Sequence, residues 1–166
     1  MSVKFDVKIT SKVMFDFLLY HTYTSVMGII GVVFGMVNLT LGIRYIVEGD
    51  SKGSMMYFIF AGIFLFAMPV YLRWNADKQV SSSKVFKNPI TYEMTDEGVQ
   101  ASQQDKGELI PWSDFIRVIS TKGNIVLYQS RNRAVILPRE DMGVQQDAVI
   151  EMISTHVTPS RVKIRR

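Results

Sequence analysis

The sequence predicts an α+β membrane protein, in which a transmembrane helical hairpin carries a small antiparallel β-barrel or sandwich and a C-terminal helix. Two stretches of the 166-residue chain, residues 25–43 and 54–72, contain no charged side chain. As helices they would each span roughly 28 Å at about 1.5 Å rise per residue, close to the ~30 Å of a bilayer's hydrocarbon layer. From residue 90 onward, short apolar runs alternate with turn signals, which is typical of β-strands.

The distribution of basic residues predicts the orientation of this hairpin. The chain has a net charge of +4 and no cysteine, so disulfide bonds and thiolate metal or redox sites are excluded. Seven basic residues flank the outer ends of the two apolar stretches: Lys4, Lys8, Lys12, Arg73, Lys78, Lys84 and Lys87. The residues that connect the stretches include only two basic ones, Arg44 and Lys52. Because cytoplasmic loops are enriched in Lys and Arg, both termini are predicted to lie in the cytoplasm.

At the N-terminus, residues 1–10 are predicted to contribute a strand to the cytoplasmic domain. Apolar side chains alternate with charged ones over residues 3–9, as in a strand with one buried face. A Thr-Ser pair then provides N-cap hydroxyls for a helix that leads into the first span. The membrane hairpin is predicted to cover residues 11–74, and the polar residues 75–89 are predicted to form a connector.

Residues 90–157 are predicted to form the cytoplasmic domain, followed by a basic tail at 158–166. Six strands are expected, at residues 90–94, 99–103, 108–110, 115–120, 125–129 and 134–137. Apolar residues on one stripe predict an amphipathic closing helix over residues 144–157. Together with the strand at 3–9, seven antiparallel strands capped by a helix follow the plan of a pleckstrin-homology-like (PH-like) barrel.

Ten residues in this region support a resemblance to a known family. They are Tyr92, Thr95, Glu97, Gly98, Trp112, Ser113, Asp114, Tyr128, Pro138 and Arg139. In their order and spacing after a helical hairpin, they resemble the YcxB-like family of bacterial membrane proteins, whose members have two membrane helices followed by a small C-terminal domain. The resemblance implies a location in the bacterial inner membrane and implies no biochemical activity.

Small residues form one face of the first apolar stretch. Gly28, Gly35 and Gly42 recur every seven residues, and Gly31 and Asn38 occupy intermediate positions on the same face. Small residues allow the backbones of membrane helices to approach closely, and an Asn side chain can form a hydrogen bond across the contact. This helix-packing face would contact either the chain's own second helix or, alternatively, a second copy or a partner's membrane helix. The short connection favours the first alternative.

The segment Trp112-Ser113-Asp114 is predicted to be structural rather than catalytic. A serine nucleophile needs a base, and the chain has only two histidines, His21 and His156, neither of which is near in sequence. Trp112 is expected to fill the domain interior, Ser113 and Asp114 to cap a short turn, and Pro138 to end a strand. Two isolated histidines also do not make a metal site. The sequence therefore predicts no catalytic residue, no metal and no cofactor.

A set of arginines is predicted to contact the lipid surface or a protein partner. The set consists of Arg131, Arg133, Arg139, Arg161, Arg165 and Arg166. Near an anionic membrane each basic residue contributes about 1 kcal/mol of attraction. The alternative is a solvated hairpin tip and a tail without a ligand. Nucleic-acid binding is not predicted, because the excess charge is small and no nucleic-acid-binding motif is present.

These features predict a non-enzymatic, membrane-anchored scaffold or regulatory module. Its cytoplasmic PH-like domain would contact a protein or the lipid surface. An alternative function is immunity, in which the protein protects a cell against a membrane-active bacteriocin or toxin. Small size, basic charge and a membrane hairpin are the features of that alternative that the chain has, and all three are generic.

Overall fold

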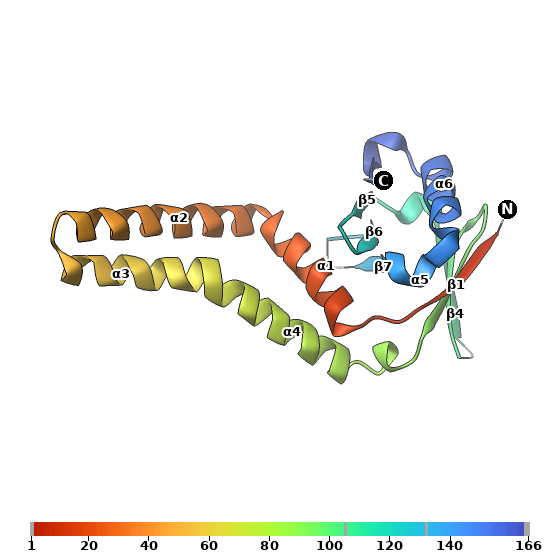
Figure 1. Ribbon diagram of the computed structural model, residues 1–166. Helices are drawn as coiled ribbons and strands as arrows, with labels where there is room; N and C mark the ends of the chain where they lie inside the picture. Colours follow the sequence, from red (N-terminus) through yellow and green to blue (C-terminus); the bar gives the residue numbers. More distant parts are fainter. Residues whose placement is uncertain (1, 105, 132, 165–166) are drawn as a thin grey trace. The chain divides into compact units, whose positions relative to one another are not determined.

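The computed structural model describes residues 2–104, 106–131 and 133–164 (Figure 1). Its elements follow in this order along the chain: β1 (Val3–Val7), α1 (Ser11–Tyr23), α2 (Val26–Val47), α3 (Ser51–Gly62), the π-helix η1 (Ile63–Ala67), α4 (Met68–Ser82), η2 (Val85–Lys87), β2 (Ile90–Met94), β3 (Gly98–Gln103), β4 (Lys106–Pro111), η3 (Trp112–Asp114), β5 (Arg117–Ser120), β6 (Asn124–Tyr128), β7 (Ala134–Pro138), α5 (Arg139–Met142), η4 (Gly143–Gln145), α6 (Gln146–His156), η5 (Pro159–Arg161) and β8 (Val162–Lys163). This composition confirms the predicted α+β class.

The chain divides into two compact units, which are described separately. The sheet unit comprises Met1–Phe17 and Gln79–Arg166, and the helical unit comprises Leu18–Lys78. The boundaries fall inside helices, because α1 and α4 each begin in one unit and end in the other.

The helical unit supplies two helical stretches that are long and apolar enough to cross a membrane. They are Val26–Val47, which is α2, and Ser51–Ser82, which comprises α3, η1 and α4. Only 17% and 11% of their most apolar windows are buried, whereas a core helix of a water-soluble protein would be mostly buried. α2 packs against α3 and η1, and large apolar side chains such as Val33 and Phe66 remain exposed.

Two polar side chains set the starts of these helices. The hydroxyl of Ser25 accepts a hydrogen bond from the backbone N–H of Gly28 (3.0 Å), so α2 starts as a new helix rather than as a continuation of α1. In the same way, the carboxylate of Asp50 accepts from the N–H of Gly53 (2.8 Å) at the start of α3. Between the helices Gly49 has a φ of 88°, a conformation that glycine adopts without strain.

The second helical stretch is longer than the sequence predicts. It continues to Ser82 instead of ending near Trp74, so it occupies the first half of the expected connector at residues 75–89. Pairs of side chains four residues apart stabilise this extension. Arg73 and Asp77 form an ion pair (3.6 Å), and the Lys78 ammonium lies 5.2 Å from the centre of the Trp74 ring.

The sheet unit contains two sheets of four strands each. In the first, the order is β1-β2-β3-β4 and every pair is antiparallel. β1 pairs with β2 over its full length, from Val3 opposite Met94 to Val7 opposite Ile90. In the second sheet the order is β7-β6-β5-β8, and β8 runs parallel to β5. β8 lies in the predicted basic tail, so the described residues form eight strands instead of seven.

Of the two predicted arrangements, a barrel or a sandwich, the described residues do not form a closed barrel, and one strand pair is parallel. The two sheets remain separate, and β4 does not pair with β5. The reason lies in the connection between them: β4 ends at Pro111, which has no N–H to donate, and the short 3-10 helix η3 follows at once. At the opposite corner, α5 contacts both β1 and β7 and covers the gap between the sheets.

The core of the sheet unit contains side chains from both sheets and from α6. Fully buried examples are Val7, Met94, Val99, Phe115, Val118, Ile125, Leu127, Leu137, Val149 and Ile153. Strand β6 is buried at all five positions rather than at alternate ones. Its outer face, which carries Asn124 and Tyr128, is covered by α1, since the rings of Phe17 and Tyr128 lie 6.1 Å apart.

The burial of Tyr92 makes the stability of the sheet unit depend on pH. Tyr92 on β2 faces Phe5 on β1, and burial raises the pKa of its phenol from 10 to about 12. The folded state therefore holds this proton more tightly than the unfolded chain. The resulting stability is present below pH 10 and is lost as the pH rises towards 12.

We expect wild type to lose about 2 kcal/mol more stability than Tyr92→Phe between pH 8 and pH 11.5. Urea unfolding of both proteins at the two pH values measures the difference. The Phe variant retains the buried ring and lacks the ionisable hydroxyl, so equal losses in the two proteins would contradict the prediction.

Candidate functional site at the open corner of the two sheets

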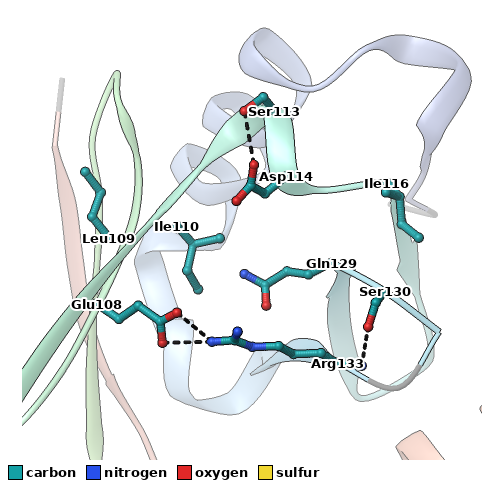
Figure 2. Close-up of a pocket in the computed structure, with 9 residues that line it drawn as sticks. All are labelled: Glu108, Leu109, Ile110, Ser113, Asp114, Ile116, Gln129, Ser130 and Arg133. Atoms are coloured by element: carbon teal, nitrogen blue, oxygen red, sulfur yellow. Dashed lines mark hydrogen bonds and ion pairs between the residues drawn. The ribbon is translucent and has the colours of Figure 1, made fainter.

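A pocket opens at the corner where β4 and β5 do not pair. It has a volume of about 540 Å³ and lies between the end of β4, the turn η3 and the connection from β6 to β7 (Figure 2). Its lining residues are Glu108, Leu109, Ile110, Ser113, Asp114, Ile116, Gln129, Ser130 and Arg133. The prediction of a β-barrel leaves no place for such a pocket, because a closed barrel has no open corner.

The pocket runs along the edge of β4 and not over one of its faces. Successive side chains of a strand point to opposite faces, yet Glu108, Leu109 and Ile110 all line the pocket. Figure 2 shows Leu109 on one side of the strand, and Glu108 and Ile110 on the other. β4 is the last strand of its sheet, and no other strand of the described residues pairs with its second edge. This edge therefore presents backbone hydrogen-bonding groups to the pocket.

Apolar side chains at the pocket are only partly covered. Leu109 is 45% exposed and Ile116 is 52% exposed, whereas Ile110 is buried. Exposed large apolar side chains beside an unpaired strand edge are typical of a surface that binds another chain.

The polar groups of the pocket carry one excess negative charge. The guanidinium Nη2 of Arg133 donates to both carboxylate oxygens of Glu108 (2.6 and 2.8 Å), which neutralises this pair across the pocket. The carboxylate of Asp114 accepts a hydrogen bond from the hydroxyl of Ser113 (3.3 Å) and remains exposed. The side-chain amide of Gln129 points into the pocket (Figure 2) and has no hydrogen-bond partner among the described residues.

Ser113 and His156 have separate hydrogen-bond partners. Within the described residues, no hydrogen bond connects Ser113 to a histidine. His156 instead has its Nδ1 3.0 Å from the carbonyl oxygen of Met152 and its Nε2 3.6 Å from Asp96. The part of the chain that the structure describes contains no cluster of three or more metal-ligating side chains.

Trp112 holds η3 in place at the rim of the pocket. Its indole N–H donates to the carbonyl oxygen of Thr95 (2.9 Å), and its ring stacks on His156 at 5.3 Å between centroids. The ring of Phe115 lies 5.9 Å away. With Trp112 buried, the next two residues, Ser113 and Asp114, lie at the pocket. Pro138 is buried at the end of β7, directly before α5.

Two of the predicted arginines, Arg133 and Arg161, use their guanidinium groups in hydrogen bonds within the sheet unit. Arg133 is bound to Glu108 in the pocket. Arg161 donates to the carbonyl oxygen of Phe115 (3.4 Å), and the backbone N–H of Arg139 donates to Gly123 (2.8 Å). Arg131 is exposed. Arg165 and Arg166 lie outside the described residues.

Three of the predicted helix-packing glycines face the chain's own second helix. A Cβ at Gly31, Gly35 or Gly42 would lie 2.8–3.3 Å from the side chains of Phe64, Leu65 and Phe58, respectively. Gly28 instead lies against the carbonyl oxygen of Thr22, where α1 gives way to α2. Asn38 is buried, but its amide donates to the Phe34 carbonyl oxygen of its own helix (2.8 Å) and not across the contact.

Gly35 and Gly62 offer a matched test of this packing. We expect Gly35→Leu to destabilise the helical hairpin by about 1–3 kcal/mol, because Leu65 occupies the space that the new side chain needs. Gly62→Leu is the control, since a Cβ there meets no atom within 4 Å. Titration of the detergent-solubilised chain with SDS measures the shift of the unfolding midpoint. Equal midpoints for the two variants would show that Gly35 is not a close contact.

One polar cluster escapes the sequence analysis. Asp16 on α1 accepts hydrogen bonds through Oδ2 from the Thr121 hydroxyl and from the Asn124 amide. Asn124 is only 1% exposed, and its amide also donates to the carbonyl oxygen of Val13 (3.4 Å). This cluster joins α1 to the turn between β5 and β6.

Comparison with known proteins agrees with the sequence resemblance. Residues 95–154 match the model of a family described as YcxB-like protein. The matched segment contains η3, the whole pocket lining and all but one of the residues on which the resemblance rests; Tyr92 lies just before it. No curated protein and no solved structure matches the chain. Residues 95–154 of the sheet unit are therefore similar to the YcxB-like family.

Proposed function

We propose that the chain is a non-enzymatic scaffold or regulatory module of the bacterial inner membrane, with both termini in the cytoplasm. The helical unit lies among membrane lipids, and the sheet unit binds a protein partner at its open corner. One observation carries the proposal: β1, which precedes both long apolar helices, pairs along its full length with β2, which follows them.

This pairing restricts how the helices can insert. Residues 3–7 and 90–94 belong to one sheet, so both must lie on the same side of a membrane. An even number of crossings satisfies this condition, and α2 with the stretch Ser51–Ser82 supplies two. The exposed apolar side chains of both helices supply the lipid-facing surface.

The charges support a cytoplasmic sheet unit. Near the turn between the helices, Arg44 in the last turn of α2 is paired with Glu48 (2.8 Å), and Lys52 in the first turn of α3 is the other basic residue. The basic residues that flank the opposite ends of the helices are more numerous, which favours the cytoplasm for that side.

The strand order supports a PH-like domain with one open corner. Four antiparallel strands are followed by three more, and then by helix α6. A closing helix after the last antiparallel strand is the expected PH-like feature. The unpaired β4 edge and the pocket then form the surface on which a partner can bind.

Topology can be tested by cysteine labelling, because the chain contains no cysteine of its own. In intact bacteria, a membrane-impermeant maleimide is expected to label Lys52→Cys in the first turn of α3. Lys84→Cys, after α4, is expected to react only once the cells are permeabilised. Labelling of Lys84→Cys in intact cells would overturn the proposed orientation.

Partner binding can be tested by site-specific photocrosslinking in living cells. A benzophenone amino acid at Ile116 in the pocket is expected to give a discrete protein adduct. The same amino acid at Val144 serves as the control, since Val144 is fully exposed and lies outside the pocket. Adducts that are absent, or equal at the two positions, would contradict a binding function for the open corner.

A further inference from the structure

We infer that the β4 edge binds an extended peptide segment of a partner protein, which adds as a further strand and presents a basic side chain to Asp114. This inference rests on the proposed function, and it specifies the kind of partner that the open corner binds.

The backbone of β4 is the first part of the argument. An unpaired edge strand offers a row of N–H and C=O groups that only another extended chain can satisfy repeatedly. The pocket lies along this edge over Glu108–Ile110. The side chain of Gln129, from the connection between β6 and β7, points into the same pocket (Figure 2).

The apolar side chains are the second part. Side chains of an added strand point alternately to its two sides. Leu109 and Ile116 are both about half exposed and lie on different walls of the pocket. They provide contacts for apolar side chains at alternate positions of the bound segment.

The third part is the charge of the pocket, which determines whether the bound peptide carries acidic or basic side chains at its remaining positions. Arg133 already donates to both carboxylate oxygens of Glu108, so an acidic peptide side chain would have to break that ion pair. Asp114 is exposed, and its partner among the described residues is a neighbouring hydroxyl. The excess negative charge therefore favours Lys or Arg in the ligand. Among the described residues that line the pocket, the cation is Arg133, which is bonded to Glu108, so the lining favours a basic peptide side chain over a lipid phosphate.

The experiment is a peptide-display selection against the full chain reconstituted in lipid nanodiscs. Random eight-residue peptides are the probe, and the expected winners alternate apolar residues with at least one Lys or Arg. Asp114→Asn is expected to weaken their binding about tenfold. Asp147→Asn, an exposed acid on α6 outside the pocket, is the matched control and is expected to leave binding unchanged.

Strand addition has a separate test on the selected peptide. N-methylation of the alternate amides that face β4 is expected to abolish binding, and N-methylation of the intervening amides is expected to be tolerated. If no peptide is enriched, if the winners are acidic, or if N-methylation has no effect, the inference is wrong. The photocrosslink from Ile116 is independent of these results, so the proposed function would survive unless that adduct is absent too.

Discussion

Replacing Trp112 with alanine is expected to lower the free energy of unfolding of the sheet unit by about 3–5 kcal/mol. Trp112 is 6% exposed and stacks on His156, so its removal leaves a cavity between η3 and α6. It also leaves the carbonyl oxygen of Thr95 without the indole donor. Urea unfolding of the full chain in detergent, followed by hydrogen exchange of the sheet amides, measures the loss.

Trp112→Phe separates the contribution of the buried ring from that of the hydrogen bond to Thr95. Phenylalanine retains most of the buried ring but cannot donate to Thr95, so we expect a loss of about 1–2 kcal/mol. Because Ser113 and Asp114 follow Trp112 directly, the alanine variant should also lose binding at the pocket. A Trp112→Ala protein as stable as wild type would show that the stacked contact with His156 does not stabilise the fold.

Replacing Asp16 with alanine is expected to destabilise the sheet unit by about 2–4 kcal/mol. The substitution removes the acceptor for both Thr121 and Asn124, and Asn124 is buried where water cannot replace it. Faster hydrogen exchange of the amides in the turn between β5 and β6 measures the local effect.

Asp6 provides the matched control for this experiment. Its carboxylate also accepts a hydrogen bond from a threonine, Thr91 (2.6 Å), but at an exposed site on the surface of the first sheet. Asp6→Ala is therefore expected to cost less than about 1 kcal/mol. If the two variants lose equal stability, burial of the Asp16 cluster is not the cause of its effect.

Local patterning was sufficient to predict most strands. The alternation of apolar and charged residues at 3–9 corresponds to β1, and the turn at Lys122–Asn124 lies between β5 and β6 as expected. These elements depend on contacts between residues close in sequence, or on one face of a single strand. The family resemblance also depends on such local motifs, and residues 95–154 confirm it.

Features that depend on packing could not be predicted in this way. Val162 and Lys163 appear as part of a polar tail, because a two-residue strand has no period of its own to detect. Asp16 appears as a lone acid next to a membrane span. Its partners, Thr121 and Asn124, are more than 100 residues away in the sequence, so no local pattern connects them.

The candidate site could be predicted only in fragments. The sequence predicts capping roles for Ser113 and Asp114 and a contact with lipid or a partner for Arg133, but it does not predict that the three line one pocket. The sequence does not identify Leu109 and Ile116 as pocket residues, because an apolar residue in or near a strand has the same sequence pattern whether its side chain is exposed or buried. Their importance follows from the failure of β4 to pair with β5, and that depends on Pro111 and the turn after it.

The pairing of β1 with β2 has a consequence for biosynthesis. The ribosome makes Val3–Val7 first, but their neighbours in the sheet, Ile90–Met94, emerge only after both long helices have been translated. The sheet therefore cannot be completed before both helices have been translated. In the proposed topology, a nascent chain that inserted only one of the two helices into the membrane would leave β1 and β2 on opposite sides of it. The edge of β2 that β1 covers would then stay unpaired. Correct threading is thus a precondition of folding, and proteases can recognise the molecules that fail it.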